Sequence, residues 1–102
     1  MKAKKIAVVL SGCGNKDGTE ITEAVSLIIG LSQAGAEVSF FAPNSEFPAK
    51  DFLTNKALLQ PRNAMLEAAR ITRGHIHDIK ELNANYFDGL ALPGGWPLWP
   101  ST

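Results

Sequence analysis

The chain has 102 residues, 45% of them hydrophobic and 20% charged, and its 10 basic residues balance its 10 acidic ones. This composition is typical of one globular domain near the lower end of the usual size range, and the lack of a long charge run argues against nucleic acid or a membrane surface as a partner. No apolar run reaches membrane-spanning length, and the basic start leads into a short apolar segment rather than a signal peptide. We therefore expect a cytoplasmic protein, which agrees with a single cysteine, Cys13, that cannot form an intrachain disulfide.

The first predicted strand is the β-branched apolar run Ile6–Leu10, which ends in the glycine-containing turn Ser11–Gly14. A helix is predicted next, because Asp17 and Glu20 have the spacing of a capping box, with Asp17 as the N-cap and Glu20 at the third helical position. Apolar residues then recur at intervals of three and four, which predicts one buried helix face: Ile21, Ala24, Val25, Ile28, Ile29 and Leu31.

A second strand is predicted at Glu37–Ala42, since Gly35 is the glycine expected just past a helix end and Pro43 stops the strand. The two strands and the helix between them form a βαβ unit, in which the strands are parallel. The sequence therefore predicts an α/β fold built on a parallel sheet.

The region after this strand is predicted to be a loop over Ser45–Gln60, with a short helical turn within Asp51–Leu59. Pro61 suits the first position of a second helix, which should run to Gly74 with Arg70 near its negative end. The apolar stripe of this helix consists of Ala64, Met65, Ala68, Ala69 and Ile71.

The last part of the chain is predicted to hold a short, half-exposed strand at His75–Ile79, a polar connector and a final apolar strand at Asp88–Leu92. The sharp turn Pro93–Gly95 follows this strand. Because the carboxyl ends of parallel strands meet at one edge of a sheet, this turn should lie beside the Ser11–Gly14 turn.

The shared edge of the two glycine turns is the candidate site, because ligands of open α/β sheets bind beyond the carboxyl ends of the strands. A dinucleotide is not favoured there, since the spacing of Gly12, Gly14 and Gly18 is one residue too long for the fingerprint. Glu20 and Glu23 lie one helical turn apart and both can reach this edge. By residue type alone, a helix cap and a solvated side chain explain them better than catalysis does.

Cysteine, histidine and glycine residues near the strand ends each have a structural and a functional interpretation. Cys13 lies near a helix start, where a thiol can be acidified, but no histidine is adjacent and an inert packing role is favoured. His75 and His77 would share one strand face, yet without a third ligand a solvated edge is favoured, so we expect no metal and no cofactor. Amides at Gly94 and Gly95 could stabilise an oxyanion, although Pro-Gly-Gly is also a good turn.

Four segments with nearly constant spacing resemble the ElbB glyoxalase family, also described as enhancing lycopene biosynthesis or sigma cross-reacting proteins. The segments are Val8–Ala24, Phe41–Pro43, Arg62–Gly74 and Leu92–Gly95. This family belongs to the PfpI-like, class I glutamine amidotransferase-like superfamily. The resemblance implies that the chain is the N-terminal part of a flavodoxin-like three-layer sandwich with a parallel sheet, in a protein that is often dimeric.

The resemblance also implies an activity and site residues. Members of the family are glyoxalase-type lyases that convert small glyoxal-type dicarbonyls to hydroxy acids with a nucleophilic cysteine and no metal. A glutamate on the first helix hydrogen-bonds the cysteine thiol, and Glu23 matches this glutamate best, with Glu20 second. The turn with Gly94 and Gly95 matches the loop that supplies an oxyanion-hole amide.

The chain departs from the family pattern after Gly95. The family continues with Phe-Gly and an Ala-Lys-Asn-type segment, and its nucleophilic cysteine comes well downstream, whereas residues 96–102 read Trp-Pro-Leu-Trp-Pro-Ser-Thr. Cys13 stands at a different, N-terminal position and cannot take the nucleophile's role. We therefore expect residues 1–95 to form a partial domain, and residues 96–102 to be an atypical tail that arises from a frameshift or alternative splicing.

This departure predicts a chain with little activity of its own. Absent later strands would leave a sheet edge and helix faces uncovered, and a chain of this length has little stability to spare, so we expect a marginally stable or partner-dependent domain. The alternative function is a non-catalytic interaction module, or short isoform, that docks on a full-length relative or forms a homo-oligomer.

Overall fold

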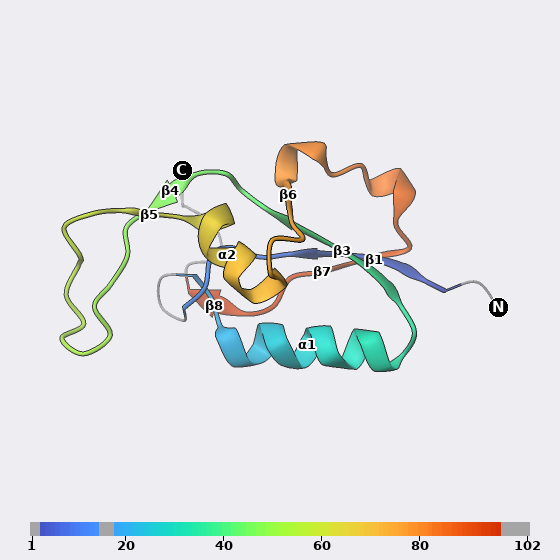
Figure 1. The fold of residues 1–102 in the computed structure, drawn as a ribbon, viewed down its shortest axis with the longest axis horizontal. Helices are drawn as coiled ribbons and strands as arrows, with labels where there is room; N and C mark the ends of the chain where they lie inside the picture. The colour runs from blue at the N-terminus through green and yellow to red at the C-terminus, as the bar shows by residue number, and fades with distance from the viewer. Residues whose placement is uncertain (1–2, 15–17, 97–102) are drawn as a thin grey trace.

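The computed structural model describes residues 3–14 and 18–96, which are organised around a four-stranded sheet with the order β6-β3-β1-β7 (Figure 1). All neighbouring strands in this sheet are parallel, as the sequence predicts. The central strands are β1 (Lys5–Val9) and β3 (Glu37–Ala42), and the outer strands are β6 (His77–Asp78) and β7 (Gly89–Ala91).

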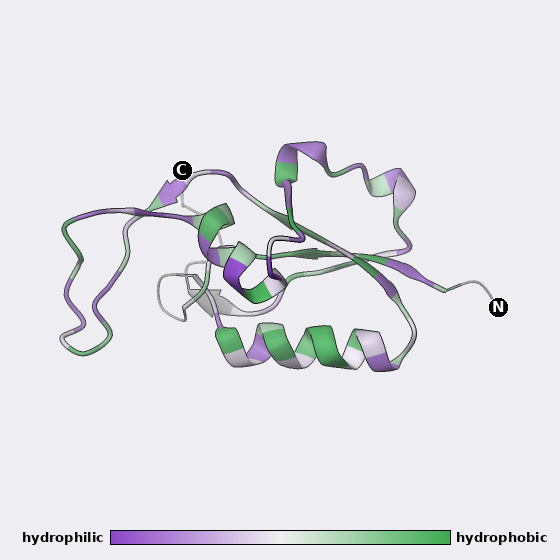
Figure 2. Ribbon diagram, viewed as in Figure 1, coloured by the Kyte–Doolittle hydropathy of each residue, from purple (hydrophilic) through white to green (hydrophobic). Residues whose placement is uncertain are grey.

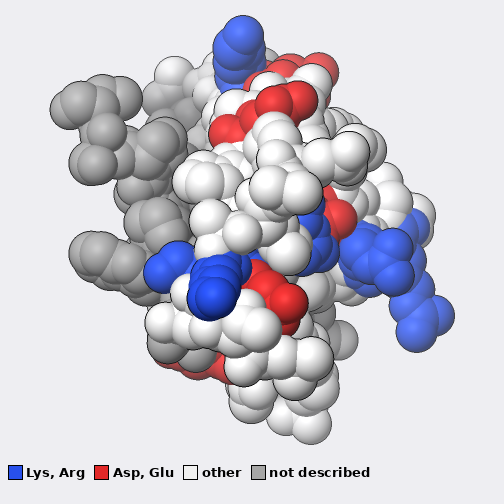
Figure 3. All heavy atoms as spheres, turned by 90° about the vertical axis from the view of Figure 1, so that its left-hand side faces the viewer, with Lys and Arg blue, Asp and Glu red and all other residues white. Residues whose placement is uncertain are grey.

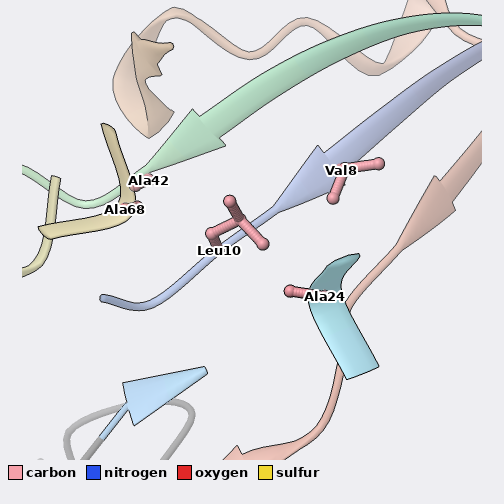
Figure 4. Packing of buried hydrophobic residues seen from close by; sticks show 5 residues of the cluster. All are labelled: Val8, Leu10, Ala24, Ala42 and Ala68. Atoms are coloured by element: carbon pink, nitrogen blue, oxygen red, sulfur yellow. The ribbon is translucent and has the colours of Figure 1, made fainter. Parts of the chain in front are cut away.

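Two helices, α1 (Ile21–Gln33) and α2 (Ala64–Thr72), cover one face of the sheet. Side chains alternate between the faces of a strand, so Val8 and the residue two positions later point to the same side. Alanines at the contact points let both helices approach the sheet closely. Figure 4 shows the resulting buried cluster, which consists of Val8, Leu10, Ala24, Ala42 and Ala68.

The opposite face of the sheet is partly covered by the connector between β6 and β7. This connector contains two short 3₁₀ helices, at Ile79–Glu81 and Ala84–Tyr86, and it lies on the other side of the sheet from α1 (Figure 1). The ring of Phe87 meets the ring of Phe41 edge to face, with centroids 5.7 Å apart. The residues of this second, smaller cluster are Ala7, Val9, Phe41, Ile79, Leu82 and Phe87.

Helix α1 buries less of its apolar surface than the sequence predicts. Of its residues only Ala24 is fully buried, while Ile21, Val25 and Ile29 are exposed, and Figure 2 shows hydrophobic residues along much of this helix. Helix α1 has 13 residues, and no helix in the described part of the chain is long and apolar enough to cross a membrane.

The predicted start of the first helix is wrong. Asp17 lies outside the described residues, and Glu20 is not at the third helical position but is itself the N-cap, with extended backbone and a side chain that accepts a 2.7 Å hydrogen bond from the backbone N–H of Glu23. The helix begins late because the preceding β2 (Gly18–Thr19) pairs with β8 (Gly95–Trp96) and therefore stays extended.

The segment between β3 and α2, predicted as a loop, is a projecting hairpin (Figure 1). At its base, β4 (Glu46–Phe47) pairs antiparallel with β5 (Arg62–Asn63). The predicted short helical turn is present near the tip, where the N–H of Asn55 donates to the carbonyl of Asp51 at 2.6 Å. Figure 3 views the molecule from this side, where basic and acidic side chains are interspersed with uncharged ones. The exposed apolar residues of the hairpin are Phe52, Leu53, Leu58 and Leu59.

The second helix begins at Ala64 rather than at the predicted Pro61, because Asn63 is its N-cap. The side chain of Asn63 accepts a hydrogen bond from the N–H of Leu66 and donates another to the side chain of Asn44, both at 2.9 Å. The helix ends at Thr72, two residues before the predicted Gly74, because Arg73 already adopts the left-handed conformation of the C-cap, with a φ of 57°.

Replacing Leu10 by alanine should destabilise the chain strongly, because Leu10 is fully buried between the sheet and both helices. We expect Leu10→Ala to lower the free energy of unfolding by about 2–5 kcal/mol, or to abolish the cooperative transition, in urea denaturation followed by circular dichroism. Leu53→Ala is the control, since Leu53 is 96% exposed at the hairpin, and it should change stability by less than about 0.5 kcal/mol. Equal effects of the two variants would contradict the packing.

Candidate functional site

The candidate site lies where the direction of the chain through the sheet reverses. From β1 the chain crosses to β3 on one side, whereas the later strand β7 pairs with β1 on its other side. The segments that follow β1 and β7 therefore leave the sheet next to each other. In open parallel sheets such a switch point forms the crevice where ligands bind.

The segments that follow β1 and β7 are joined by the β2–β8 pair. Gly18 lies opposite Trp96 and Thr19 lies opposite Gly95 in this antiparallel pair. The pairing continues to the start of α1, where the backbone N–H of Glu20 donates to the carbonyl of Gly94 at 2.7 Å. The turn after the last strand is thereby fixed to the beginning of the first helix, and the predicted proximity of the two glycine turns is confirmed.

Thr19 anchors the β2–β8 pair to the end of β1, a role that the sequence does not reveal. Thr19 is fully buried, and its hydroxyl accepts a 2.6 Å hydrogen bond from the N–H of Ser11. Its own N–H donates to the carbonyl of Ser11 at 2.9 Å. Gly18 is required beside it, because a Cβ there would stand 2.6 Å from the same carbonyl oxygen. The only sequence signal is this glycine, which reads equally well as part of a loop.

The carboxylate of Glu23 lies directly over Gly94. Both carboxylate oxygens are 2.8 Å from the position that a Cβ of Gly94 would occupy, so any side chain at residue 94 would displace them. Glu23 is also exposed to solvent, as expected for the first turn of a surface helix. Glu20 does not share this position, because its own carboxylate caps the helix. The structure thus separates the two glutamates that the sequence leaves as alternatives.

The N–H of Gly95 points away from β2. In an antiparallel pair, residues that exchange hydrogen bonds alternate with residues that do not. Because Glu20 donates to Gly94, the next pair, Thr19 and Gly95, belongs to the second kind. The N–H of Thr19 accordingly turns away to Ser11, and the N–H of Gly95 is directed to the opposite side.

The remaining predicted residues have less specific settings. Cys13 is half-buried in the segment after β1, with its backbone N–H beside Gly18. His75 and His77 are exposed and lie at β6, the edge strand far from β7. Within the described residues, no group of three His, Cys, Asp or Glu side chains is placed to hold a metal ion.

The arrangement provides a carboxylate and a backbone donor at one turn. A carboxylate at this place can accept and return a proton, and a backbone N–H can stabilise a developing negative charge on oxygen. The two groups come from Glu23 at the start of α1 and from the turn after β7. Such a pair suits reactions at a carbonyl carbon, in which an oxyanion forms and protons move nearby.

No protein-family model matches the sequence, but three curated proteins are similar to most of it. Glutamine amidotransferase-like class 1 domain-containing protein 3, mitochondrial, from Homo sapiens is 43% identical over 96 residues, which cover 92% of this chain and 36% of the relative. The ES1 protein homolog, mitochondrial, from Rattus norvegicus is 42% identical over 94 residues, and the ES1 protein, mitochondrial, from Danio rerio is 40% identical over 99 residues. The chain spans 35% and 36% of the lengths of these two.

A solved structure matches the fold closely. The crystal structure of an isoprenoid biosynthesis protein with an amidotransferase-like domain from Ehrlichia chaffeensis superposes with a TM-score of 0.88 at 38% sequence identity. The match covers 91% of this chain and 44% of the bacterial one. It confirms the flavodoxin-like α/β architecture predicted from the sequence.

The same relatives correct the expected location. All three curated proteins are named as mitochondrial, which contradicts the cytoplasmic location expected from the sequence. That expectation rested on the lack of a secretory signal and of a membrane-spanning run. Neither feature reports on delivery to an organelle, which depends on a separate address.

Two glycine substitutions should have different effects on stability, because Gly18 lies against the backbone of Ser11 and Gly94 lies against the side chain of Glu23. Gly18→Ala places a Cβ against a backbone oxygen that cannot move, and we expect a loss of about 1–3 kcal/mol in urea denaturation. Gly94→Ala should cost less than about 1 kcal/mol, because the flexible side chain of Glu23 can swing away. The NMR signals of the Glu23 side chain should shift in Gly94→Ala. Unchanged signals would contradict the contact between Glu23 and Gly94.

Proposed function

Because the chain belongs to the superfamily of class I glutamine amidotransferase-like domains, we propose that it carries part of the site of a cofactor-independent glyoxalase. The reaction converts glyoxal-type dicarbonyls to hydroxy acids by cysteine chemistry. One carbonyl carbon is oxidised, its neighbour is reduced and one water is consumed, so the site moves protons and needs no external oxidant. The observation that carries the proposal is the carboxylate of Glu23 over Gly94 at the switch point of the sheet.

Glu23 is proposed to be the proton shuttle of this reaction. A cysteine thiolate adds to an aldehyde carbon, and the carboxyl group of Glu23 takes and returns the protons that the substrate exchanges. The position of Glu23 supports this role, since it is the glutamate whose carboxylate is not used to cap α1. Glu20 is correspondingly a structural residue.

Gly95 is proposed to donate its backbone N–H to the oxyanion that forms when the thiolate adds. The β2–β8 pairing supports this proposal, because it directs this N–H away from β2. Gly94 contributes by having no side chain, which lets the carboxylate of Glu23 lie over the turn. A fixed backbone donor needs no reorganisation during the reaction, which is why such donors contribute strongly to catalysis.

The nucleophilic cysteine is proposed to come from a part of the fold that this chain does not match. Cys13 follows β1, whereas the family to which the sequence bears a resemblance has its nucleophile well downstream of the Pro-Gly-Gly turn. The chain spans only 36% of the human relative, so most of that protein lies outside the match. The names of the curated relatives also favour a mitochondrial setting for this chain.

The chain by itself should not turn over glyoxal. We expect no glycolate above the buffer background when the purified chain is incubated with glyoxal, because the carboxylate and the donor lack a nucleophile. Product formation can be followed by chromatography. Turnover that Cys13→Ser abolishes would contradict the assignment and make Cys13 the nucleophile.

The role of Glu23 can be tested in a chimera in which residues 3–95 replace the matched region of the Ehrlichia chaffeensis protein. We expect this chimera to form glycolate from glyoxal, and Glu23→Gln to lower kcat by about 10²–10⁴-fold, as is usual when a general acid–base is lost. Glu37→Gln is the matched control, because Glu37 is an exposed glutamate at the start of β3. It therefore lies at the amino-terminal ends of the parallel strands, away from the candidate site. This variant should leave kcat unchanged.

Two outcomes would overturn the proposal. A folded chimera without glyoxalase activity would exclude this reaction, and equal rates for the parent and Glu23→Gln would exclude the proton shuttle. Cys13→Ser in the same chimera should leave kcat within about twofold of the parent, since the general base and the nucleophile lie elsewhere.

A further inference from the structure

One face of the sheet is open near β7. Leu90 in β7 is 58% exposed, although its register partner Ala7 in β1 is buried on that face. Beside Leu90, the connector leaves an apolar cavity of about 240 Å³. The cavity is lined by Ala7, Leu82, Ala84, Phe87, Asp88, Gly89 and Leu90.

The edge of the sheet is also open at β7. Within the described residues, β7 pairs with β1 on one side only and is the outermost strand of the sheet. Its three residues, Gly89–Ala91, therefore present backbone groups on the outer side. Such an edge is a template for another strand. The open edge and the open face meet at Leu90, so one partner can cover both.

The surface formed by Leu90, the adjacent cavity and the outer side of β7 is apolar and nearly uncharged. Its one charged lining residue is Asp88, whose carboxylate already accepts a 2.8 Å hydrogen bond from the backbone N–H of Lys5. Leu82 and Phe87 are half-buried and Leu90 is exposed, so their remaining apolar surface favours contact with another apolar side chain. A partner for this surface needs an apolar helix face and a strand that can pair with β7.

We propose that this surface binds the part of the amidotransferase-like fold that lies outside the region matched by this chain. Parallel sheets are normally buried on both faces. The Ehrlichia chaffeensis protein contains this same sheet at a TM-score of 0.88, and more than half of its chain lies outside the match. The occupant is therefore a polypeptide that adds a strand beside β7 and an apolar helix over Leu90. This inference concerns assembly and does not depend on the proposed activity.

The proposal can be tested by co-expressing the chain with the segment of the Ehrlichia chaffeensis protein that follows its counterpart of Leu92–Gly95. We expect the two polypeptides to co-purify as a one-to-one complex. Leu90→Asp should weaken binding by at least about tenfold in isothermal titration, because it places a charge in the apolar contact. The matched control is Leu59→Asp, since Leu59 is a fully exposed leucine on the projecting hairpin. It should leave the affinity within about twofold.

Hydrogen exchange provides a second readout that does not depend on a variant. Amides of residues 82–92 should exchange more slowly in the complex, while those of the hairpin tip at residues 51–59 should not change. Failure of the two polypeptides to co-purify would overturn the proposal. Equal loss of binding in the two aspartate variants would also overturn it. A dimer of this chain that Leu90→Asp disrupts, and that the segment does not displace, would show that a second copy is the occupant.

Discussion

The β2–β8 pair is the interaction on which the candidate site depends. Pairing of β1 with β7 in the sheet does not fix the positions of the segments that follow these strands. Here four residues of those segments fix them by forming an antiparallel ladder. The ladder continues into the hydrogen bond from Glu20 to Gly94, so the start of α1 and the turn after β7 are joined into one unit. Thr19 then ties this unit to Ser11 at the end of β1.

The two glutamates at the start of α1 have different tasks because the helix begins at residue 21. With Glu20 as the N-cap, its carboxylate satisfies a backbone N–H that would otherwise lack a partner. Glu23 is one turn further along, where a carboxylate is favoured by the helix dipole and faces the glycine turn. If the helix began at residue 18, both side chains would rotate to other positions. A backbone pairing therefore decides which carboxylate reaches the turn.

The sequence predicts the parallel sheet, both helices and the meeting of the two glycine turns, because these follow from apolar periodicity and from the topology of βαβ units. It does not predict the β2–β8 pair, because two-residue strands have no periodicity to detect. The false capping box at Asp17 follows from the same gap. Burial along α1 was also mispredicted, since apolar spacing shows that Val25 can face a core but not whether anything covers it.

The base of the projecting hairpin has a consequence for how the fold tolerates change. Asn44 and Asn63 are joined by a side-chain hydrogen bond, and Arg62 forms an ion pair with Glu67 of α2, so the two ends of the excursion are fixed to each other and to the helix. The entropic cost of closing a loop grows only slowly with its length. The segment between these anchors can therefore become longer or shorter over evolution, while the start of α2 and the sheet keep their positions.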